Sequence, residues 1–164
     1  MANEAWLNGK LDGFSPLMMP AAHALAQARA ELENLPALNL EELNARPGGA
    51  PSVGFHLHHI AGSLDRLLTY ARGGELDAAQ FDFLKRETAG NYDPAADLVR
   101  KAVEKINHAL GELKNAAPET LFEKRYVGRE KLETNVFGLL FHLAEHTARH
   151  VGQVVTTAKI VKNR

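Results

Sequence analysis

The chain contains 164 residues, 45% of them hydrophobic and 24% charged, with a formal net charge of -1, which is typical of a single globular domain spanning residues 1–164. No run of lysine or arginine exceeds two residues, and this argues against nucleic acid or an acidic membrane surface as a partner. The N-terminal segment lacks the basic start and apolar run of a signal peptide, and no later stretch approaches 18 apolar residues, so we expect a cytoplasmic protein without a membrane span.

Apolar residues recur at helical spacing along most of the chain, and no segment shows the alternation that is typical of strands. Ser52 and Thr134 are well placed as N-caps of long helices, and Gly73-Gly74 ends the first of these two. Residues 116–131 are expected to form a loop with a short extended piece. In chain order, the predicted helices are about 16–35, 40–45, 53–72, 78–88, 94–114 and 135–161, with a start as late as Met19 or Pro20 left open for the first.

Four long amphipathic helices and two short ones predict an all-α protein. The favoured arrangement is an antiparallel four-helix bundle with a crossover connection, because the segment between the second and third long helices can span the bundle. The short helix 78–88 belongs to this connection, and Phe81 and Leu84 are expected to face the core. The N-terminal arm is expected to be anchored by Trp6 and Phe14.

Histidine is the compositional outlier, because three of the eight histidines fall within 56–59 and three within 142–150. In the second cluster, His142, His146 and His150 are spaced by four residues, so their side chains lie along one side of a helix. One helical turn rises ~5.4 Å, so only one adjacent pair can share an ion. His146 and His150 border the apolar stripe, whereas His142 points more nearly to solvent. The ordinary alternative is that all three are polar residues beside a core.

A metal site in a helical bundle takes its ligands from facing helices, so a third ligand is expected from the first cluster. The helical wheel slightly prefers His56 over His59, makes His58 the weakest candidate, and does not decide between the first two. Because cysteine is absent, the ligands have to be nitrogen or oxygen atoms. Three imidazoles and an open position suit Zn or Ni, with Fe or Mn as alternatives, and would lower the pKa of a bound water.

Two stretches resemble the motifs of the DinB/YfiT-like family of metal-binding four-helix bundles. They are Ser52-Val53 followed by His59-Ile60, and the run HTARHVGQ at 146–153. The resemblance covers nearly the whole chain in helix order. It implies that the metal ligands are His59, His146 and His150, which leaves His56, His142 and Gln153 as supporting residues or alternative ligands. It also implies a divalent cation, commonly Zn or Ni, a homodimer and, in some branches, a low-molecular-weight thiol as cosubstrate.

The leading hypothesis is therefore a metal-dependent enzyme that activates water or a thiol for hydrolysis or group transfer on a small molecule. The alternatives are a non-catalytic metal-binding or stress-response protein, and a structural dimer whose histidines line a cavity. Glu145 is a candidate for orienting one imidazole, and Arg66, Tyr70 and Arg149 are candidates for meeting an anionic substrate.

Overall fold

The structure is a computed structural model that describes residues 4–90 and 92–163. Within these residues the chain is mostly helical and carries one small two-stranded sheet. The elements are η1 (Ala5–Asn8), α1 (Met19–Glu33), α2 (Leu40–Asn44), η2 (Pro47–Gly49), α3 (Val53–Ala71), α4 (Ala78–Arg86), α5 (Ala95–Asn115), η3 (Pro118–Thr120), β1 (Lys124–Val127), β2 (Leu132–Asn135) and α6 (Val136–Lys162).

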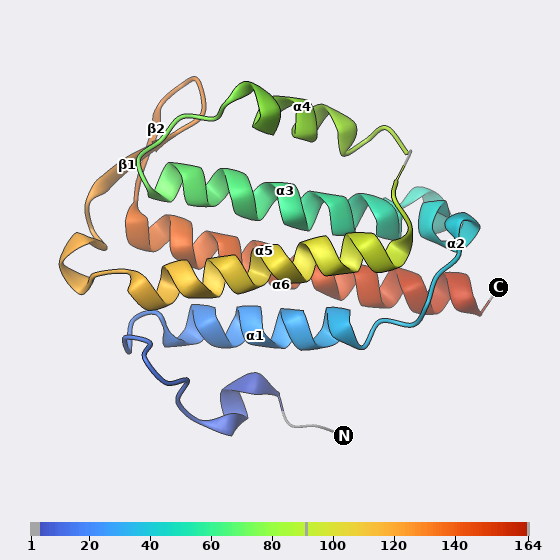
Figure 1. Ribbon diagram of the computed structural model, residues 1–164, viewed down its shortest axis with the longest axis horizontal. Coiled ribbons are helices and arrows are strands. Elements are labelled where there is room, and N and C mark those ends of the chain that lie inside the picture. The colour runs from blue at the N-terminus through green and yellow to red at the C-terminus, as the bar shows by residue number, and fades with distance from the viewer. Residues whose placement is uncertain (1–3, 91, 164) are drawn as a thin grey trace.

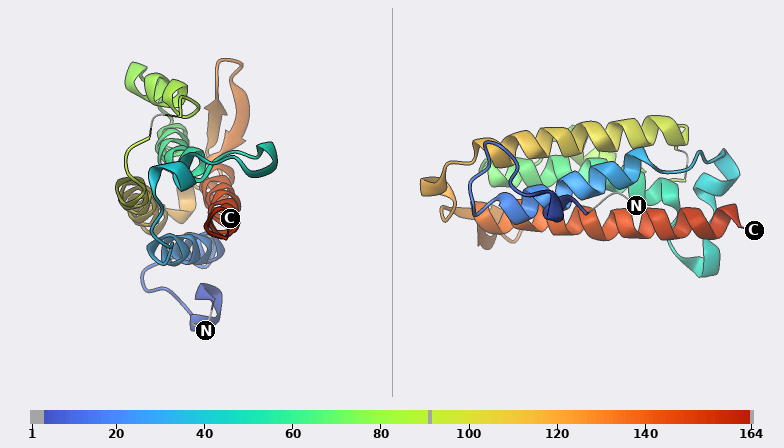
Figure 2. Two further views of the ribbon diagram at one scale, coloured as in Figure 1. Left: turned by 90° about the vertical axis from the view of Figure 1, so that its right-hand side faces the viewer. Right: turned by 90° about the horizontal axis from the view of Figure 1, so that it is seen from below.

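The long helices α1, α3, α5 and α6 pack around one core, in which α3 and α1 each contact both α5 and α6 (Figure 1). In Figure 1, α3 and α5 run in one direction, whereas α1 and α6 run in the other. Figure 2 shows α4 and the N-terminal arm outside these four helices. Leu25, Leu57, Ile106 and Val154 supply one fully buried side chain from each long helix. No helix in the described ranges is both long enough and apolar enough to cross a membrane.

Side-chain caps explain where several helices begin. The side chains of Asn39, Ser52 and Asp77 each accept a hydrogen bond from a backbone N–H three residues further on. The last helix is capped by Asn135 and not by Thr134, because it is the Asn135 side chain that accepts the hydrogen bond from the backbone N–H of Gly138. The first long helix begins at Met19 and not at residue 16, in agreement with the late start at Met19 or Pro20 that the sequence left open.

The structure differs from two expectations about peripheral segments. The short extended piece expected within the loop 116–131 is β1, but it pairs with β2 as an antiparallel hairpin that was not expected, with Lys124 opposite Asn135; the four-residue strands are too short to show a clear alternation. Trp6 does not anchor the arm, because its side chain is 60% exposed and its indole N–H donates to Glu4. Phe14, by contrast, packs against the core.

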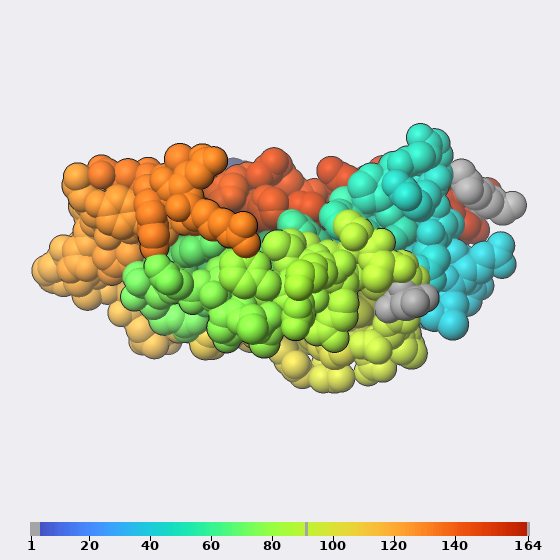
Figure 3. All heavy atoms as spheres, turned by 90° about the horizontal axis from the view of Figure 1, so that it is seen from above, coloured from blue at the N-terminus to red at the C-terminus, as the bar shows by residue number. Residues whose placement is uncertain are grey.

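The face of α4 that meets the rest of the molecule also differs from the expectation. Phe81 and Leu84 are 39% and 41% exposed, and it is Phe83 that faces α3. The physical reason is that α4 packs on the outside of α3 and not into the core between the long helices. In the space-filling view of Figure 3, α4 and the hairpin lie side by side on one face of the molecule.

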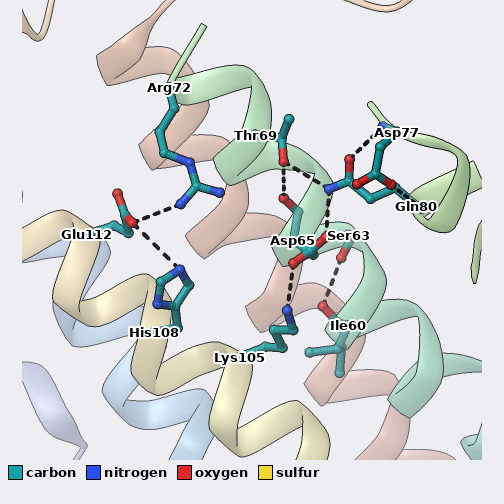
Figure 4. Close-up of polar contacts among 10 residues, drawn as sticks. All are labelled: Ile60, Ser63, Asp65, Thr69, Arg72, Asp77, Gln80, Lys105, His108 and Glu112. Atoms are coloured by element: carbon teal, nitrogen blue, oxygen red, sulfur yellow. Dashed lines mark hydrogen bonds and ion pairs between the residues drawn. The ribbon is translucent and has the colours of Figure 1, made fainter. Parts of the chain in front are cut away.

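A polar cluster fixes α4 to its neighbours (Figure 4). Gln80 on α4 donates to Asp65 and Thr69 on α3, at 2.6 and 2.9 Å. Lys105 on α5 donates to the other carboxylate oxygen of Asp65 at 2.6 Å. Burial raises the pKa of Asp65, but the hydrogen bonds from Lys105 and Gln80 outweigh it, and the net shift is downward. One carboxylate therefore links three helices.

Candidate metal centre

Histidines from two helices meet in the contact between α3 and α6. Nε2 of His59 lies 2.9 Å from Nε2 of His146. The centroid of the His150 ring lies 4.4 Å from that of His59 and 4.5 Å from that of His146. One nitrogen of each ring lies within 4.8 Å of the other two, a spacing at which three nitrogens can hold one metal ion. We name His59, His146 and His150 the histidine trio.

Local helix geometry explains why these side chains meet. Ser52 caps α3, which places His59 two turns into the helix. On α6, His146 and His150 are one turn apart and therefore point to the same side. Phe55, one turn before His59, stacks on its ring with centroids 5.6 Å apart and 14° between the planes. This contact restricts the rotation of the His59 ring.

Glu87, which follows α4, holds the far side of the His59 ring. Nδ1 of His59 lies 2.7 Å from one carboxylate oxygen of Glu87, and Arg66 donates to the other oxygen at 2.7 Å. Burial raises the pKa of Glu87, but the hydrogen bonds from His59 and Arg66 outweigh it, so the net shift is downward and the group is a carboxylate. With Nδ1 donating to Glu87, the lone pair of Nε2 is directed into the trio, as in carboxylate–histidine–metal arrangements.

The sequence contained no signal for Glu87. It lies at the end of a helix that has no buried residues of its own, although Glu87 itself is only 2% exposed. The space for it comes from Gly62 on α3, where an added Cβ would lie 2.5 Å from a Glu87 oxygen. Only the pairing of α3 with α4 reveals that the glycine and the glutamate belong together.

His56, the alternative third ligand, lies behind His150. Its Nδ1 is 2.8 Å from Nδ1 of His150, and the residue is 2% exposed. Nε2 of His56 is buried and has no hydrogen-bond partner among the described residues. If Nδ1 of His150 donates to His56, Nε2 of His150 is left as the atom that can bind an ion. The structure thus brings His59 into the trio and makes His56 a partner of His150.

The rings of His56, His146 and His150 are neutral at physiological pH. Burial, and secondarily the neighbouring His59, lowers the pKa of His56 to about 4. Burial and the nearby rings lower the pKa of His146 to about 4 and that of His150 to about 3. Neutral imidazole is the form that binds metal, so the donor set fits a divalent cation of the kind that nitrogen ligands prefer.

His142 and Glu145 lie beside the trio but do not complete it. The His142 ring is 5.3 Å from that of His146, and its Nδ1 is 2.7 Å from Glu145. Glu145 also accepts from Arg149 at 2.8 Å, so it does not orient a ring of the trio as expected. Arg149 donates to Nδ1 of His146 at 3.2 Å. Coordination through Nε2 of His146 puts a proton on Nδ1, so this contact with Arg149 would have to open.

The remaining candidates lie elsewhere. Gln153 is exposed and makes no hydrogen bond to the trio within the part of the chain that the structure describes. Arg66 is engaged with Glu87, and Tyr70 lines a separate hollow beside the hairpin. The ring of His58 stacks on Phe83 with centroids 4.1 Å apart, away from the trio.

Comparison with known proteins agrees with this arrangement. A profile of the DinB superfamily matches residues 24–154, a range that includes both histidine clusters. No curated protein matches the chain significantly. The match extends over most of the 164 residues and confirms the resemblance that the two histidine motifs indicated. The chain belongs to the DinB superfamily.

Proposed function

We propose that this protein is a metal-dependent enzyme in which His59, His146 and His150 bind a divalent cation. The observation that carries the proposal is the convergence of three half-buried imidazoles, in two of which Nδ1 faces a group that can accept its proton. Such an ion would act as a Lewis acid and lower the pKa of a bound water or thiol, for hydrolysis or group transfer on a small molecule. Three protein ligands leave a coordination position for that group.

Neighbouring side chains orient two rings of this site before any ion binds. Glu87 and Phe55 hold the ring of His59, and His56 holds that of His150. Arg149 lies at the edge of the trio with an exposed side chain, where its charge favours an anionic substrate. In Figure 3, the surface of α6 is uncovered between the hairpin and the segment that precedes α3, which gives a small molecule a direction of approach.

The finer features of the proposal rest on the family and on the donor set. Zn or Ni is favoured over Fe or Mn because nitrogen sites generally bind Ni and Zn more tightly than Fe and Mn. A low-molecular-weight thiol is the proposed cosubstrate. We interpret α1, α3, α5 and α6 as a four-helix bundle, antiparallel between α3 and α6 and between α1 and α5, whose crossover connection contains α4. A homodimer is the proposed assembly, and the exposed Phe122, Leu132 and Phe141 near the hairpin offer apolar surface for it.

The test of the proposal is elemental analysis of protein purified without an affinity tag, before and after mild chelation. About one equivalent of a divalent metal per chain is expected, since the trio offers one site. A screen for hydrolysis and thiol transfer with that metal would then identify the reaction. Protein that takes up no metal after reconstitution, with its histidines intact, would exclude a metal enzyme.

A second candidate is a metal-binding protein without turnover. The observation that favours it is that the trio connects α3 with α6, and Glu87 connects the same site to α4. An ion would therefore stabilise the packing of three helices. In this case chelation lowers the melting temperature, while no substrate responds to the reconstituted protein.

A further inference from the structure

A cavity of about 340 Å³ lies beside the N-terminal end of α3. Its lining comes from the segment that precedes α3, from Phe55 of α3 itself and from the segment that follows α4. In Figure 3, these two segments lie next to each other, at the other end of the molecule from the hairpin. A volume of this size is at the lower end of the range for sites of small organic molecules.

Two residues connect this cavity to the histidine trio. Phe55, which lines the cavity, stacks on the ring of His59 with 5.6 Å between the centroids. Thr88, which also lines it, directly follows Glu87, the carboxylate that contacts Nδ1 of His59. The uncovered surface of α6 is bordered by the segment that precedes α3, which lines the cavity as well. Phe55 is one helical turn, about 5.4 Å, before His59, so the cavity is within reach of a small molecule that is bound at the trio.

The lining of the cavity is accessible to such a molecule. Most of the side chains that line it are exposed or partly exposed, namely Asn44, Arg46, Pro51, Phe55, Thr88 and Tyr92. The rings of Phe55 and Tyr92 offer apolar surface, and the amide of Asn44 and the hydroxyl of Thr88 can donate hydrogen bonds. No acidic side chain lines the cavity among residues 4–90 and 92–163. A negatively charged group therefore meets no acidic side chain of the lining there.

Arg46 is the one charged side chain among the described residues of the lining. Its guanidinium donates to the backbone oxygens of Gly49 and Ala50, both at 3.4 Å, near the limit of a hydrogen bond. These carbonyl groups orient the side chain, but no acidic partner pairs with it within the part of the chain that the structure describes. Burial raises the pKa of Tyr92, whereas the charge of Arg46 acts in the opposite direction, so this charge acts on the wall of the cavity.

We propose that this cavity holds the far end of the substrate of the metal centre, and that this end is a carboxylate. The substrate is then a small organic molecule with a metal-binding group at one end and a carboxylate at the other. The carboxylate lies at Arg46, Asn44 and Thr88 donate further hydrogen bonds to it, and the chain between the two ends crosses Phe55. The inference rests on the proposed function, because the other end of the substrate lies at the ion, and it adds the class of the substrate.

The experiment uses the full chain loaded with Co(II), whose visible spectrum changes when a thiolate binds to it. The probes are ω-mercaptohexanoate and ω-mercaptooctanoate, each compared with the mercapto alcohol of the same length. Acid and alcohol share the thiol that binds the metal and differ only at the far end. We expect at least one acid to bind about three- to fivefold more tightly than its alcohol at low ionic strength, the range of an ion pair at an exposed guanidinium.

Three variants locate the carboxylate, and the ratio of the two affinities within each variant is the readout. A change in the site that affects acid and alcohol equally does not alter this ratio. Arg46→Gln removes the charge in the cavity and should abolish the preference for the acid. Arg129→Gln is the matched control and should keep the preference, because Arg129 is exposed and does not line this cavity. Arg149→Gln removes the cation at the edge of the trio and should reduce the preference less than Arg46→Gln does.

Equal affinities for acid and alcohol, or a preference that Arg46→Gln does not reduce, would overturn this inference and leave the proposed function intact. A preference that is lost in Arg149→Gln and kept in Arg46→Gln would place the carboxylate at the edge of the trio and would overturn it too. Protein that binds no Co(II), or Co(II) protein whose spectrum responds to no thiol, would contradict the proposed function and this inference with it.

Discussion

Glu87 and Glu145 make the same local contact with very different consequences. Each accepts from Nδ1 of a histidine at 2.7 Å, Glu87 from His59 and Glu145 from His142. Glu87 is buried and also binds Arg66, whereas Glu145 lies at the surface with a side chain that is 34% exposed. The first histidine belongs to the trio and the second does not. A carboxylate can orient a metal ligand only when its histidine reaches the ion.

Replacement of Glu87 by Gln tests this difference. The amide oxygen still accepts from His59, but the charge that supports the ring and pairs with Arg66 is lost. We expect the affinity for Zn to fall by about 10- to 100-fold, the usual cost of losing such a partner. Competitive titration with a zinc chelator measures the affinity. Glu145→Gln is the matched control and should leave the affinity unchanged; equal losses in both variants would contradict a specific role for Glu87.

Separate replacements of His56 and His59 by Ala decide between the two alternatives that the helical wheel left open. His59→Ala removes a nitrogen of the trio, so tight binding of metal should be lost. His56→Ala removes only the partner of His150, so binding should weaken but stay at one equivalent per chain. Metal counted after dialysis gives the stoichiometry. Full retention in His59→Ala would reject the ligand assignment, and His58→Ala should behave like the natural chain.

At the scale of elements, α4 is important because Glu87, which follows it, contacts the ring of His59 from outside the core. It packs on α3 next to Gly62, where a Cβ would lie 2.5 Å from Glu87 and 2.6 Å from Phe83. No buried residue lies within α4 itself, so its position depends on Asp65, Gln80 and the contacts of Glu87. A helix attached in this way can be displaced without loss of the core.

Gly62→Ala is the corresponding test. The added methyl group has to push α4 away from α3, which we expect to lower the free energy of unfolding by about 1–3 kcal/mol and to weaken metal binding as Glu87 moves. Gly111 lies in α5 with no atom near an added Cβ. Gly111→Ala should therefore stabilise the protein by about 0.5–1 kcal/mol, and urea unfolding measures both changes. A Gly62→Ala protein with unchanged stability and affinity would show that α4 does not position Glu87.

For the whole molecule, the buried histidines make stability depend on pH. In the unfolded chain these rings titrate near 6.5, whereas the folded rings of His56 and His146 titrate at about 4 and that of His150 at about 3. Between these values the unfolded state binds more protons than the folded state. The free energy of unfolding of the metal-free protein should therefore decrease as the pH falls below 6.5.

Urea unfolding in the presence of a chelator, from pH 7 to pH 5, measures this dependence. His150→Gln removes one of the titrating rings and should make the dependence on pH shallower. A free energy of unfolding that stays constant over this range would contradict the lowered pKa values. With those pKa values, the rings become protonated in the unfolded state while they stay neutral in the folded state, and this difference makes the free energy of unfolding depend on pH.

Local interactions account for what the sequence by itself determined. The starts of α2, α3 and α4 follow from Asn39, Ser52 and Asp77, whose hydrogen bonds reach only three residues along the chain. The spacing of His146 and His150 places both rings on one side of α6 for the same reason, since a helical turn is a local structure. The family motifs added His59, which helix geometry alone had not separated from His56.

The tertiary structure decided the features that depend on segments far apart in the chain. Glu87 lies 28 residues after His59, and no periodicity relates the two. The choice of Phe83 over Phe81 as the inward residue of α4 depends on how that helix rotates against α3. The hairpin of β1 and β2 depends on pairing between strands and not on the preference of either strand. Spacing along a helix shows which residues share a face, whereas packing between helices selects the partners that each face meets.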